Sequence, residues 1–314
     1  MKEIIAPIDR SVLERELNQD RFVRTANNGT NHIYIIDHLN APNVMREIGR
    51  LREITFRDAG GGTGKEADID DYDTADIPYQ QLLVWNPEEK EIIGGYRFIK
   101  CSAVQRTESG VPGLATTDLF RFSENFCKEY LPYTIELGRS FVQPRYQPSI
   151  RNRKGLFSLD NLWDGLGALV IDNPDVKYFF GKVTMYTTFD KEARDMILSF
   201  MHYYFPDNDQ LVSPHEPLAL FNDMASFTEQ FKGLIYKEGH RILNQQVRAR
   251  DENIPPLINS YMNLSASMKT FGTAFNDHFG DVEETGILVT ISEIYESKKD
   301  RHLSTYTPGE KKPL

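Results

Sequence analysis

The chain has 314 residues, of which 40% are hydrophobic and 26% charged, and its formal net charge is −10. This composition is that of an ordinary globular protein, and the acidic balance argues against broad nucleic-acid binding, which needs a basic surface. No apolar run in the sequence approaches the roughly 20 residues needed to cross a bilayer. The early acid Glu3 and the lack of a long apolar core argue against a signal peptide. We therefore expect a cytoplasmic protein with no nucleic-acid partner.

The first elements are an arm, a strand and a helix. Residues 1–30 are expected to form a loosely held arm, and residues 33–37 a short strand. Pro42 predicts a helix start, because proline is favoured in the first turn. The helix is expected to end before Gly60. Its inward face repeats at helical spacing and carries Val44, Ile48, Leu51 and Thr55.

A glycine-rich and acidic loop follows at residues 58–78. Its run Ala59–Lys65 is close to a Walker phosphate-binding loop, but Glu66 stands where Ser or Thr would ligate Mg²⁺, and a helix precedes it. We interpret the glycines as a mobile lid, because glycine lowers the cost of backbone movement. The acids of this loop either form a solvated surface or reach inward to pair with Arg97 or Arg139. These acids are Asp70, Asp71, Asp73 and Asp76.

Strands are predicted at residues 81–85 and 92–99, with a hairpin loop at residues 86–90 between them. A helix is expected near residues 123–130 and a further strand over residues 133–143. The two cysteines show neither metal-ligand spacing nor a disulfide framework. We interpret them as reduced, partly buried thiols and expect no bound metal.

The strand at residues 133–143 carries Glu136 and Arg139 in its middle. Charges in a core strand are costly unless they are paired or functional. One interpretation is a structural ion pair. The other is a site that binds an anion and moves a proton, because a basic segment follows and leads to a helix start, where anions are favoured. The basic residues of this segment are Arg145, Arg151, Arg153 and Lys154.

Beyond this segment, helices and strands alternate. Asp160 and Asp190 are each expected to cap a helix, with a strand at residues 178–184 between them. The remaining expected elements are a polar helix within residues 205–250, a helical turn or two from Pro255, a strand at residues 287–291 and a polar tail from residue 298.

This order predicts an α/β or α+β fold, in which helices flank a central mixed sheet. We expect one domain over residues 31–295, of which residues 205–285 form a helical extension. The arm at residues 1–30 precedes the domain, and a flexible tail at residues 296–314 follows it.

Several motifs, taken in order, resemble a known family. They are Asp70-x-Tyr72-Asp73, Gly95-x-Arg97, Glu136-Leu-Gly-Arg139-Ser140, Leu162-Trp163-x-Gly165-Leu166 and Pro255-Pro256-Leu-Ile-x-x-Tyr261-x-x-Leu264. The chain resembles the acyl-homoserine-lactone synthases. It resembles more closely their relatives, the ornithine and glycine N-acyltransferases that make bacterial aminolipids and are often labelled hemolysin-like. The resemblance spans roughly residues 33–291.

The resemblance implies the fold of the GNAT acyltransferases, a twisted mixed sheet splayed to admit a pantetheine arm. It implies a long-chain, often 3-hydroxylated, acyl donor carried by acyl carrier protein or coenzyme A, and no permanently bound cofactor. The acceptor would be the α-amine of glycine or ornithine. The lipid-like product fits transient contact with the inner face of the membrane.

The resemblance also suggests roles for residues. Glu136 is the expected general base, with Arg139 and Ser140 beside it. Residues expected to bind substrate are Asp70, Asp73, Arg97, Phe141, Val142 and Trp163. Residues expected to bind the donor or its carrier are Arg145, Arg151, Arg153 and Lys154. The long segment that holds them fits a phosphopantetheine presented by a protein.

Two other functions stand as alternatives. One is an acyl-homoserine-lactone-type synthase with S-adenosylmethionine as acceptor, which the length disfavours because those enzymes resemble only the part up to about residue 210. The other is a non-enzymatic haemolytic toxin, which is disfavoured because the sequence shows no strongly amphipathic basic helix.

Overall fold

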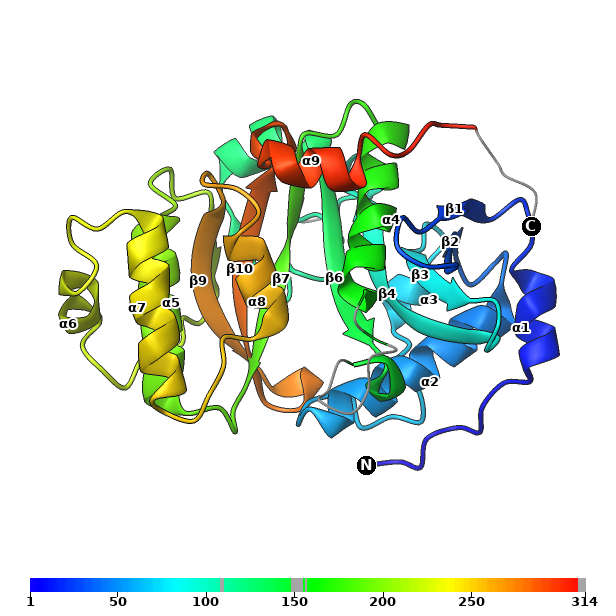
Figure 1. The fold of residues 1–314 in the computed structure, drawn as a ribbon, viewed down its shortest axis with the longest axis horizontal. Coiled ribbons are helices and arrows are strands. Elements are labelled where there is room, and N and C mark those ends of the chain that lie inside the picture. Colours follow the sequence, from blue (N-terminus) through cyan, green and yellow to red (C-terminus); the bar gives the residue numbers. More distant parts are fainter. Residues whose placement is uncertain (108–109, 148–154, 156, 310–314) are drawn as a thin grey trace. The chain divides into compact units, whose positions relative to one another are not determined.

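The structure is a computed structural model, and it describes residues 1–107, 110–147, 155 and 157–309 (Figure 1). The chain forms two compact units. Unit 1 comprises Met1–Leu114, Tyr133–Lys177 and Glu296–Leu314, and unit 2 comprises Ala115–Pro132 and Tyr178–Tyr295. Each unit is therefore assembled from separate stretches of the chain.

Unit 1 is built on antiparallel strands in the order β1-β2-β3-β4-β6. These strands are β1 (Phe22–Thr25), β2 (His32–Ile36), β3 (Gln80–Asn86), β4 (Glu91–Lys100) and β6 (Thr134–Val142). The predicted hairpin is the pair β3 and β4, and the predicted charged strand is β6. Most side chains of β3 and β4 are buried on both faces, because helices cover the sheet from both sides.

The helices of unit 1 are α1 (Arg10–Glu16), α2 (Pro42–Asp58), α3 (Asp71–Thr74), α4 (Ser158–Asp172) and α9 (Glu296–His302). Helix α2 starts at Pro42 and ends before Gly60, as predicted. Its first turn is completed by Glu16 of α1, which accepts hydrogen bonds from the backbone N–H groups of Asn43 and Val44, both at 2.9 Å. These donors have no partner within the helix, so Glu16 satisfies them and places a negative charge at the positive end of the helix dipole.

The two faces of the unit 1 sheet carry different chemistry. Leu82 of β3 points toward α4, and a Cβ at Gly165 of α4 would lie 2.7 Å from Leu82 Cδ2. Gln81, the preceding residue, points to the opposite face, because side chains alternate along a strand. There it accepts a hydrogen bond from Arg52 of α2. The face toward α4 is thus apolar, and the face toward α2 holds polar groups.

Unit 2 contains the antiparallel strands β7 (Tyr178–Tyr186), β10 (Val282–Thr290) and β9 (Lys269–Asn276), in that order. A separate pair joins β5 (Phe120–Phe122) to β8 (Val212–Pro214). The helices are α5 (Lys191–Tyr204), α6 (Met224–Glu229), α7 (Tyr236–Arg248) and α8 (Pro256–Met262), with a π-helical turn at Phe126–Tyr130. Asp190 caps α5 as predicted, since its side chain accepts from the N–H of Ala193 at 2.8 Å.

Both ends of the chain are more structured than the sequence indicated. Residues 1–30 contain α1 and β1, and their buried side chains include Leu13 and Phe22. In the region expected to be a flexible tail, α9 packs against α4 (Figure 1). His302 at the end of α9 is buried, and its Nδ1 lies 2.7 Å from Asp164 Oδ1 of α4.

Two other expectations about elements are corrected. Asp160 does not cap α4, which begins two residues earlier with Phe157 at the capping position. Asp160 lies in the first turn, where it pairs with Arg301 at 2.8 Å. The region at residues 205–285 holds two helices within residues 205–250, α6 and α7, where one was expected, and the expected α8 from Pro256. It also contains strands β8 and β9. In the described part of the chain, no helix has both the length and the apolar character to cross a membrane.

Candidate active site

The ladder between β4 and β6 is interrupted at Arg139. On one side of the interruption Gly95 pairs with Phe141, and on the other Arg97 pairs with Gly138. Strand β6 therefore has one residue more than β4 between these pairs, which is a β-bulge. Arg139 lies in the bulge with a left-handed φ of +48°. Backbone groups at a bulge leave the regular ladder and become available to other partners.

Two glycines of β4 allow β6 to approach at the bulge. A Cβ at Gly94 would lie 2.3 Å from the backbone oxygen of Phe141. A Cβ at Gly95 would lie 2.7 Å from the backbone oxygen of Leu82 and 3.3 Å from the ring of Phe141. Neither position has room for a side chain, so the close approach of β6 to β4 requires glycine at both positions.

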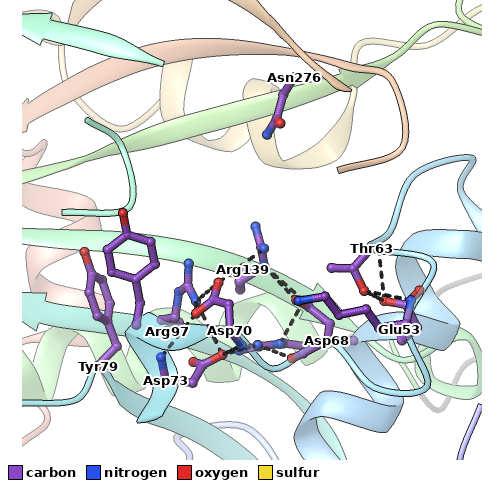
Figure 2. Close-up of polar contacts among 12 residues, drawn as sticks. Glu53, Thr63, Asp68, Asp70, Asp73, Tyr79, Arg97, Arg139 and Asn276 are labelled. Carbon is purple, nitrogen blue, oxygen red and sulfur yellow. Dashed lines mark hydrogen bonds and ion pairs between the residues drawn. The ribbon is translucent and has the colours of Figure 1, made fainter. Parts of the chain in front are cut away.

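A network of buried charges covers the face of the sheet toward α2 (Figure 2). Its members come from α2, from the segment that leads into α3, and from β4 and β6. They are Arg52, Asp68, Asp70, Asp73, Arg97 and Arg139. Three positive and three negative groups balance one another, which is the condition under which buried charges are tolerated.

Arg52 is the centre of the network and is fully buried. Its Nε lies 3.1 Å from Asp68 Oδ2, and its Nη2 lies 2.7 Å from Asp73 Oδ2. It also donates to the backbone oxygen of Asp68, and its Nη1 donates to Gln81 Oε1 at 3.3 Å. Arg52 thereby joins the acidic segment to both α2 and β3.

Arg97 joins the same segment to β4. Its Nη1 lies 2.7 Å from both carboxylate oxygens of Asp70 and 3.4 Å from Asp73 Oδ2. Its guanidinium carbon lies 5.0 Å from the centre of the Tyr79 ring, in the arrangement of a cation–π contact. The sequence-based alternative in which Asp70 and Asp73 reach inward to pair with Arg97 is confirmed.

Asp70 and Asp73 also form a capping box around α3. Asp70 Oδ1 accepts from the N–H of Asp73, and Asp73 Oδ2 accepts from the N–H of Asp70, both at 3.2 Å. The same two carboxylates therefore shape the turn and bind the arginines. Their spacing of three residues is that of a capping box, in which Asp70 is the N-cap residue and Asp73 is at position N3.

Arg139 forms the open end of the network. Its Nε lies 2.9 Å from Asp68 Oδ2, and its Nη2 lies 3.6 Å from Asp70 Oδ2. The side chains of Arg139 and Asp70 are 13% and 23% exposed, whereas those of Arg52 and Asp73 are 0% exposed. Of these four side chains, Arg139 and Asp70 are therefore the ones that solvent reaches.

The charges in the network shift one another's protonation. Burial alone would raise the pKa of Asp73, but the guanidinium groups of Arg52 and Arg97 outweigh it and hold this pKa below its ordinary value. Burial alone would lower the pKa of Arg97, but Asp73 and Asp70 raise it instead. Asp73 and Arg97 are therefore both ionised at neutral pH.

Glu136 is a buried acid on β6, 2% exposed. Tyr79 donates its hydroxyl hydrogen to Glu136 Oε1 at 3.0 Å. Glu136 pairs across the ladder with Ile99 and is two residues from Gly138, which pairs with Arg97, so it faces the same side of the sheet as the network. A buried carboxylate next to a bulge is thus placed beside the accessible end of a charge network.

Cys101 lies close to Glu136. Burial raises the pKa of the Cys101 thiol well above its ordinary value, and the charge of Glu136 raises it further. The thiol therefore stays protonated at neutral pH and is a poor nucleophile.

The glycine-rich loop is tied down in this structure (Figure 2). Glu53 of α2 accepts from the N–H and hydroxyl of Thr63 at 3.1 and 2.7 Å, and from the N–H of Gly64 at 2.8 Å. Gly62 takes a φ of +93°, and its missing Cβ leaves room for Glu53. The loop expected to be a mobile lid is therefore folded around a buried carboxylate.

The other residues expected in the site lie elsewhere in unit 1 or outside the residues that the structure describes. Trp163 is half-buried on α4, the helix on the apolar face of the sheet. Arg145 is exposed and forms ion pairs with Glu89 at 3.3 Å and with Glu91. Ser140, Phe141 and Val142 belong to β6 at and after the bulge. The expected donor-binding residues Arg151, Arg153 and Lys154 lie outside the described residues.

The sequence did not predict the roles of Arg52, Asp68, Gln81 and Tyr79. A signal was present for Arg52, because a charged residue follows Leu51 on the inward face of a helix. For Asp68, the signal was the repeated spacing of carboxylates before α3.

Within the described residues, no group of three or more His, Cys, Asp or Glu side chains could hold a metal ion.

The chain is similar to known acyltransferases. Residues 51–154 match the family model of the acetyltransferase (GNAT) domain. The chain is 56% identical over 306 residues to the glycine N(alpha)-acyltransferase of Bacteroides thetaiotaomicron, which covers 98% of this chain and 91% of that protein. It is 55% identical to the protein of the same name from Phocaeicola vulgatus, covering 98% of this chain and 94% of that protein.

Among solved structures, the acyl-homoserine-lactone synthase LasI is 13% identical, covers 49% of this chain and 72% of that one, and gives a TM-score of 0.30. This likeness is too low to support a conclusion about the chain.

The GNAT domain and the named relatives define the class of the protein, an N-acyltransferase. The chain belongs to the glycine N(alpha)-acyltransferase family. The enzyme class and the GNAT-type α/β fold expected from the sequence are confirmed, and the alternative of a non-enzymatic toxin is not.

Proposed function

We propose that the chain transfers a long-chain acyl group, 3-hydroxylated as the family resemblance implies, from acyl carrier protein to the α-amine of glycine. The product is an aminolipid or its precursor. One observation carries the choice of glycine over ornithine: the chain aligns along 98% of its length with two glycine N(alpha)-acyltransferases.

Amide formation from a thioester makes three chemical demands. The acceptor ammonium must lose a proton to expose its lone pair, the oxyanion that forms on the thioester carbonyl must be stabilised, and the thiolate must leave. The amine nitrogen forms the new bond to the carbonyl carbon as the carbon–sulfur bond breaks. The acceptor nitrogen loses two protons in all, one to a base before it attacks and one as the amide forms, and one of the two ends on the departing thiolate.

Glu136 is the base in this proposal, acting directly or through one water. Its burial and its place next to the bulge support the role. Tyr79 fixes the carboxylate by donating to Oε1, and this carboxylate receives the proton. Arg139 pairs with Asp68 and Asp70, which are the acids of the segment that leads into α3.

The bulge is the proposed site for the thioester oxygen. Ser140 lies where the ladder is interrupted, and Phe141 and Val142 resume the pairing directly after it. Backbone N–H groups of Ser140–Val142 are the proposed donors, because fixed donors stabilise a developing oxyanion. Arg139 and Asp70 would position the acceptor at the exposed end of the network, with Asp73 and Arg97 behind them. Phe141, Val142 and Trp163 remain proposed substrate contacts.

Transfer would be direct, without an acyl-cysteine intermediate. Cys101 lies near Glu136, but its raised pKa keeps the thiol protonated. The donor's phosphopantetheine is proposed to bind the basic segment of Arg151, Arg153 and Lys154. Arg145 would contribute only by exchanging its ion pairs with Glu89 and Glu91 for the donor. We propose a cytoplasmic enzyme that contacts the membrane surface transiently, where its lipid product leaves.

The test is an assay of the purified protein with matched donors and acceptors. A long-chain 3-hydroxyacyl group is supplied on acyl carrier protein or on coenzyme A, with glycine or ornithine as acceptor, and products are identified by mass spectrometry. The proposal predicts N-acylglycine as the main product and acyl carrier protein as the better donor. Acylation of ornithine in preference to glycine would contradict the proposed acceptor. Equal use of acyl carrier protein and coenzyme A would contradict the proposed donor.

A further inference from the structure

The glycine-rich loop has no part in the mechanism proposed above, and the first residues of the chain lie along it. We refer to residues 1–8 as the strap. The N–H of Lys2 donates to the backbone oxygen of Gly64 at 2.8 Å, and the N–H of Ile5 donates to that of Glu66 at 3.0 Å. The strap is therefore attached to the loop by backbone hydrogen bonds at two points.

The strap is also attached to helix α2. The N–H of Ile8 donates to Glu47 Oε2 at 3.1 Å, and the backbone oxygen of Lys2 accepts from Arg57 Nη1 at 2.7 Å. Glu47 and Arg57 are separated by roughly 15 Å along the helix axis. The first residues of a domain are usually poorly ordered unless they are tied down, and here they are tied down at both ends of the strap.

Arg57 joins three parts of unit 1. Its Nε lies 2.7 Å from Glu53 Oε1 on the preceding turn of α2. Its Nη1 donates to the backbone oxygen of Lys2 in the strap, and its Nη2 donates to that of Lys65 in the loop. A guanidinium holds its donors in a fixed planar fork, so one side chain binds the helix, the strap and the loop in a single geometry.

Glu53 is the acid at the centre of these contacts. It is buried, and burial alone would raise its pKa, but hydrogen bonds from Thr63, Arg57 and Gly64 outweigh burial and hold this pKa below its ordinary value. The carboxylate is therefore ionised at neutral pH. Hydrogen bonds to an ionised group are roughly twice as strong as those between neutral groups, so Glu53 fixes both Arg57 and the loop.

Gly64 connects the acid to the strap. Its N–H donates to Glu53 Oε1 at 2.8 Å, and its backbone oxygen accepts from the N–H of Lys2 at 2.8 Å. Its φ of +73° is left-handed, a conformation that glycine adopts without the cost that a Cβ would bring. Movement of this residue would therefore disturb the contacts with the helix and with the strap together.

The path from the loop to the charge network is short. Glu66 accepts from the strap, and two residues later the N–H of Asp68 donates to the backbone oxygen of Gly49 in α2 at 2.9 Å. A Cβ at Gly49 would lie 2.6 Å from Ile69 Cγ1 and 3.3 Å from the backbone oxygen of Asp68, so this segment lies directly on the helix. Asp70 follows at the end of the network that solvent reaches.

One face of α2 supports this whole path. Gly49, Glu53 and Arg57 follow one another at a spacing of four residues, which places them above one another on the same face of the helix. Gly49 contacts the segment of Asp68, and the other two bind the loop and the strap. The strap, the loop and the acidic segment are thus held in register by a single helix face.

We propose that Arg57 is a positioning residue for binding of the acceptor. By holding the strap and the loop, it keeps Asp70 in place beside Arg139. The inference rests on the proposed function, in which Arg139 and Asp70 position glycine. It gives a role to two segments that the sequence suggested were a loose arm and a mobile lid.

The alternative is that Arg57 only stabilises unit 1, and the two roles predict different behaviour of a folded variant. A purely stabilising contact lowers the free energy of unfolding but leaves the folded site unchanged, so the KM for glycine stays the same. A positioning contact raises this KM, because glycine binds only the fraction of molecules whose acidic segment is in place. Turnover at saturating glycine is kept in both cases, since Tyr79 holds Glu136 on β6.

The first test is hydrogen exchange of the whole chain without substrates. The variant is Arg57→Ala, and the matched control is Arg46→Ala, which changes an exposed arginine of the same helix. Arg57→Ala loses charged donors to the strap and the loop, so exchange at residues 2–5 and 63–68 is expected to rise at least about tenfold. Exchange in β3 is expected to keep its wild-type rate, and Arg46→Ala to match the wild type throughout.

The second test is the steady-state rate of N-acylglycine formation. In Arg57→Ala, the KM for glycine is expected to rise at least about threefold, with kcat and the KM for the acyl donor close to wild type. Arg46→Ala is expected to keep all three constants. Chemical denaturation of both variants shows that the proteins compared are folded.

Several outcomes would overturn the inference. They are wild-type exchange at residues 63–68 in Arg57→Ala, raised exchange with a wild-type KM for glycine, a lower kcat at an unchanged KM, and an equal rise of KM in Arg46→Ala. If Arg57→Ala does not fold, Ile5→Pro tests the same attachment from the strap, because proline has no N–H to donate to Glu66. Wild-type exchange or a wild-type KM for glycine in Ile5→Pro would again overturn it.

The two readouts separate this inference from the proposed function. If the wild-type protein forms no N-acylglycine, the proposed function fails, while exchange still reports whether Arg57 holds the loop. If the wild type forms N-acylglycine and folded Arg57→Ala keeps the wild-type KM for glycine, only the inference fails.

Discussion

Arg139 combines two features that each cost free energy. Its backbone is left-handed, which is unfavourable for a residue with a Cβ, and its charge is largely withdrawn from water. The ion pairs with Asp68 and Asp70 hold the Arg139 side chain in this position despite both costs. Strain kept in place by surrounding contacts is common at functional sites, which agrees with a role for this bulge in catalysis.

Two substitutions separate the backbone strain from the charge. Arg139→Ala removes the guanidinium and leaves a Cβ at the left-handed position, whereas Arg139→Gly removes both. We expect the glycine variant to be more stable than the alanine variant by about 1 kcal/mol, and both to lose acyl transfer activity. Chemical denaturation and initial rates measure the two effects. Equal stability would show that the backbone is unstrained, and an active Arg139→Gly would remove the guanidinium from the mechanism.

At the level of residues, the sequence predicted four of the six members of the charge network. Asp70, Asp73, Arg97 and Arg139 were recognisable because their charges lie in segments that otherwise read as core or turn. Arg52 was not predicted, because its place on the inward face of a helix is a weak signal when single charges on amphipathic helices are most often solvated. Its partners are distant in sequence and come together only through the fold.

Helix α4 depends on two glycines for its packing. Gly165 faces the flexible end of the Leu82 side chain of β3, with 2.7 Å from a built Cβ to Cδ2. Gly167 faces the backbone, since a Cβ there would lie 2.3 Å from the carbonyl oxygen of His302 at the end of α9. The first contact can be relieved by a change of rotamer, but the second requires α9 to move.

Alanine at each glycine tests this difference. Because alanine favours helix over glycine by about 1 kcal/mol, Gly165→Ala is expected to change stability by less than about 1 kcal/mol. Gly167→Ala is expected to destabilise unit 1 by about 1–3 kcal/mol, the range for overpacking, and to loosen α9. Thermal unfolding measures the first effect, and hydrogen exchange at residues 296–303 measures the second. Equal stability in the two variants would contradict the packing of α9 on α4.

At the level of elements, strands with strong apolar patterns were predictable, as β3, β4, β6 and β7 show. The missed elements had weak local signals. Strand β9 contains Lys269, Gly272 and Asn276, which are depleted in strands, and it exists because β10 pairs along it. Asp160 was placed wrongly as a cap because its carboxylate is used for tertiary contacts with Asn28 and Arg301.

For the molecule as a whole, the charge network makes stability depend on pH. The pKa of Asp73 is lower in the folded protein than its ordinary value of 3.8. Its ion pairs therefore contribute fully above that value. As the pH falls below it, the unfolded chain binds the proton more readily than the folded one, and the contribution is lost as the pH falls toward the lowered pKa.

Asp73→Asn tests this dependence. At neutral pH the variant is expected to be less stable by about 3–5 kcal/mol, because Arg52 and Arg97 lose a buried partner. Between about pH 5 and pH 3, its free energy of unfolding is expected to fall less steeply than that of the wild type. Denaturation curves across this range give both quantities. If the free energy of unfolding falls equally with pH in both proteins, Asp73 is not the cause of the pH dependence.

At the same scale, the sequence indicated the fold class and enzyme class, because the motifs of both occur in order along the chain. It did not indicate two compact units, since unit 1 takes its last helix from the end of the chain and unit 2 takes β5 from the middle. Such assembly from distant segments leaves no local pattern.

The most direct test of the account is the rate of N-acylglycine formation by purified Glu136→Gln. Glutamine preserves the size of the side chain but cannot take up the proton. The account predicts that turnover falls at least about 10²-fold, with an unchanged unfolding temperature, while the exposed control Glu124→Gln keeps wild-type turnover. Near-normal N-acylglycine formation by a folded Glu136→Gln would contradict the central claim that Glu136 is the base.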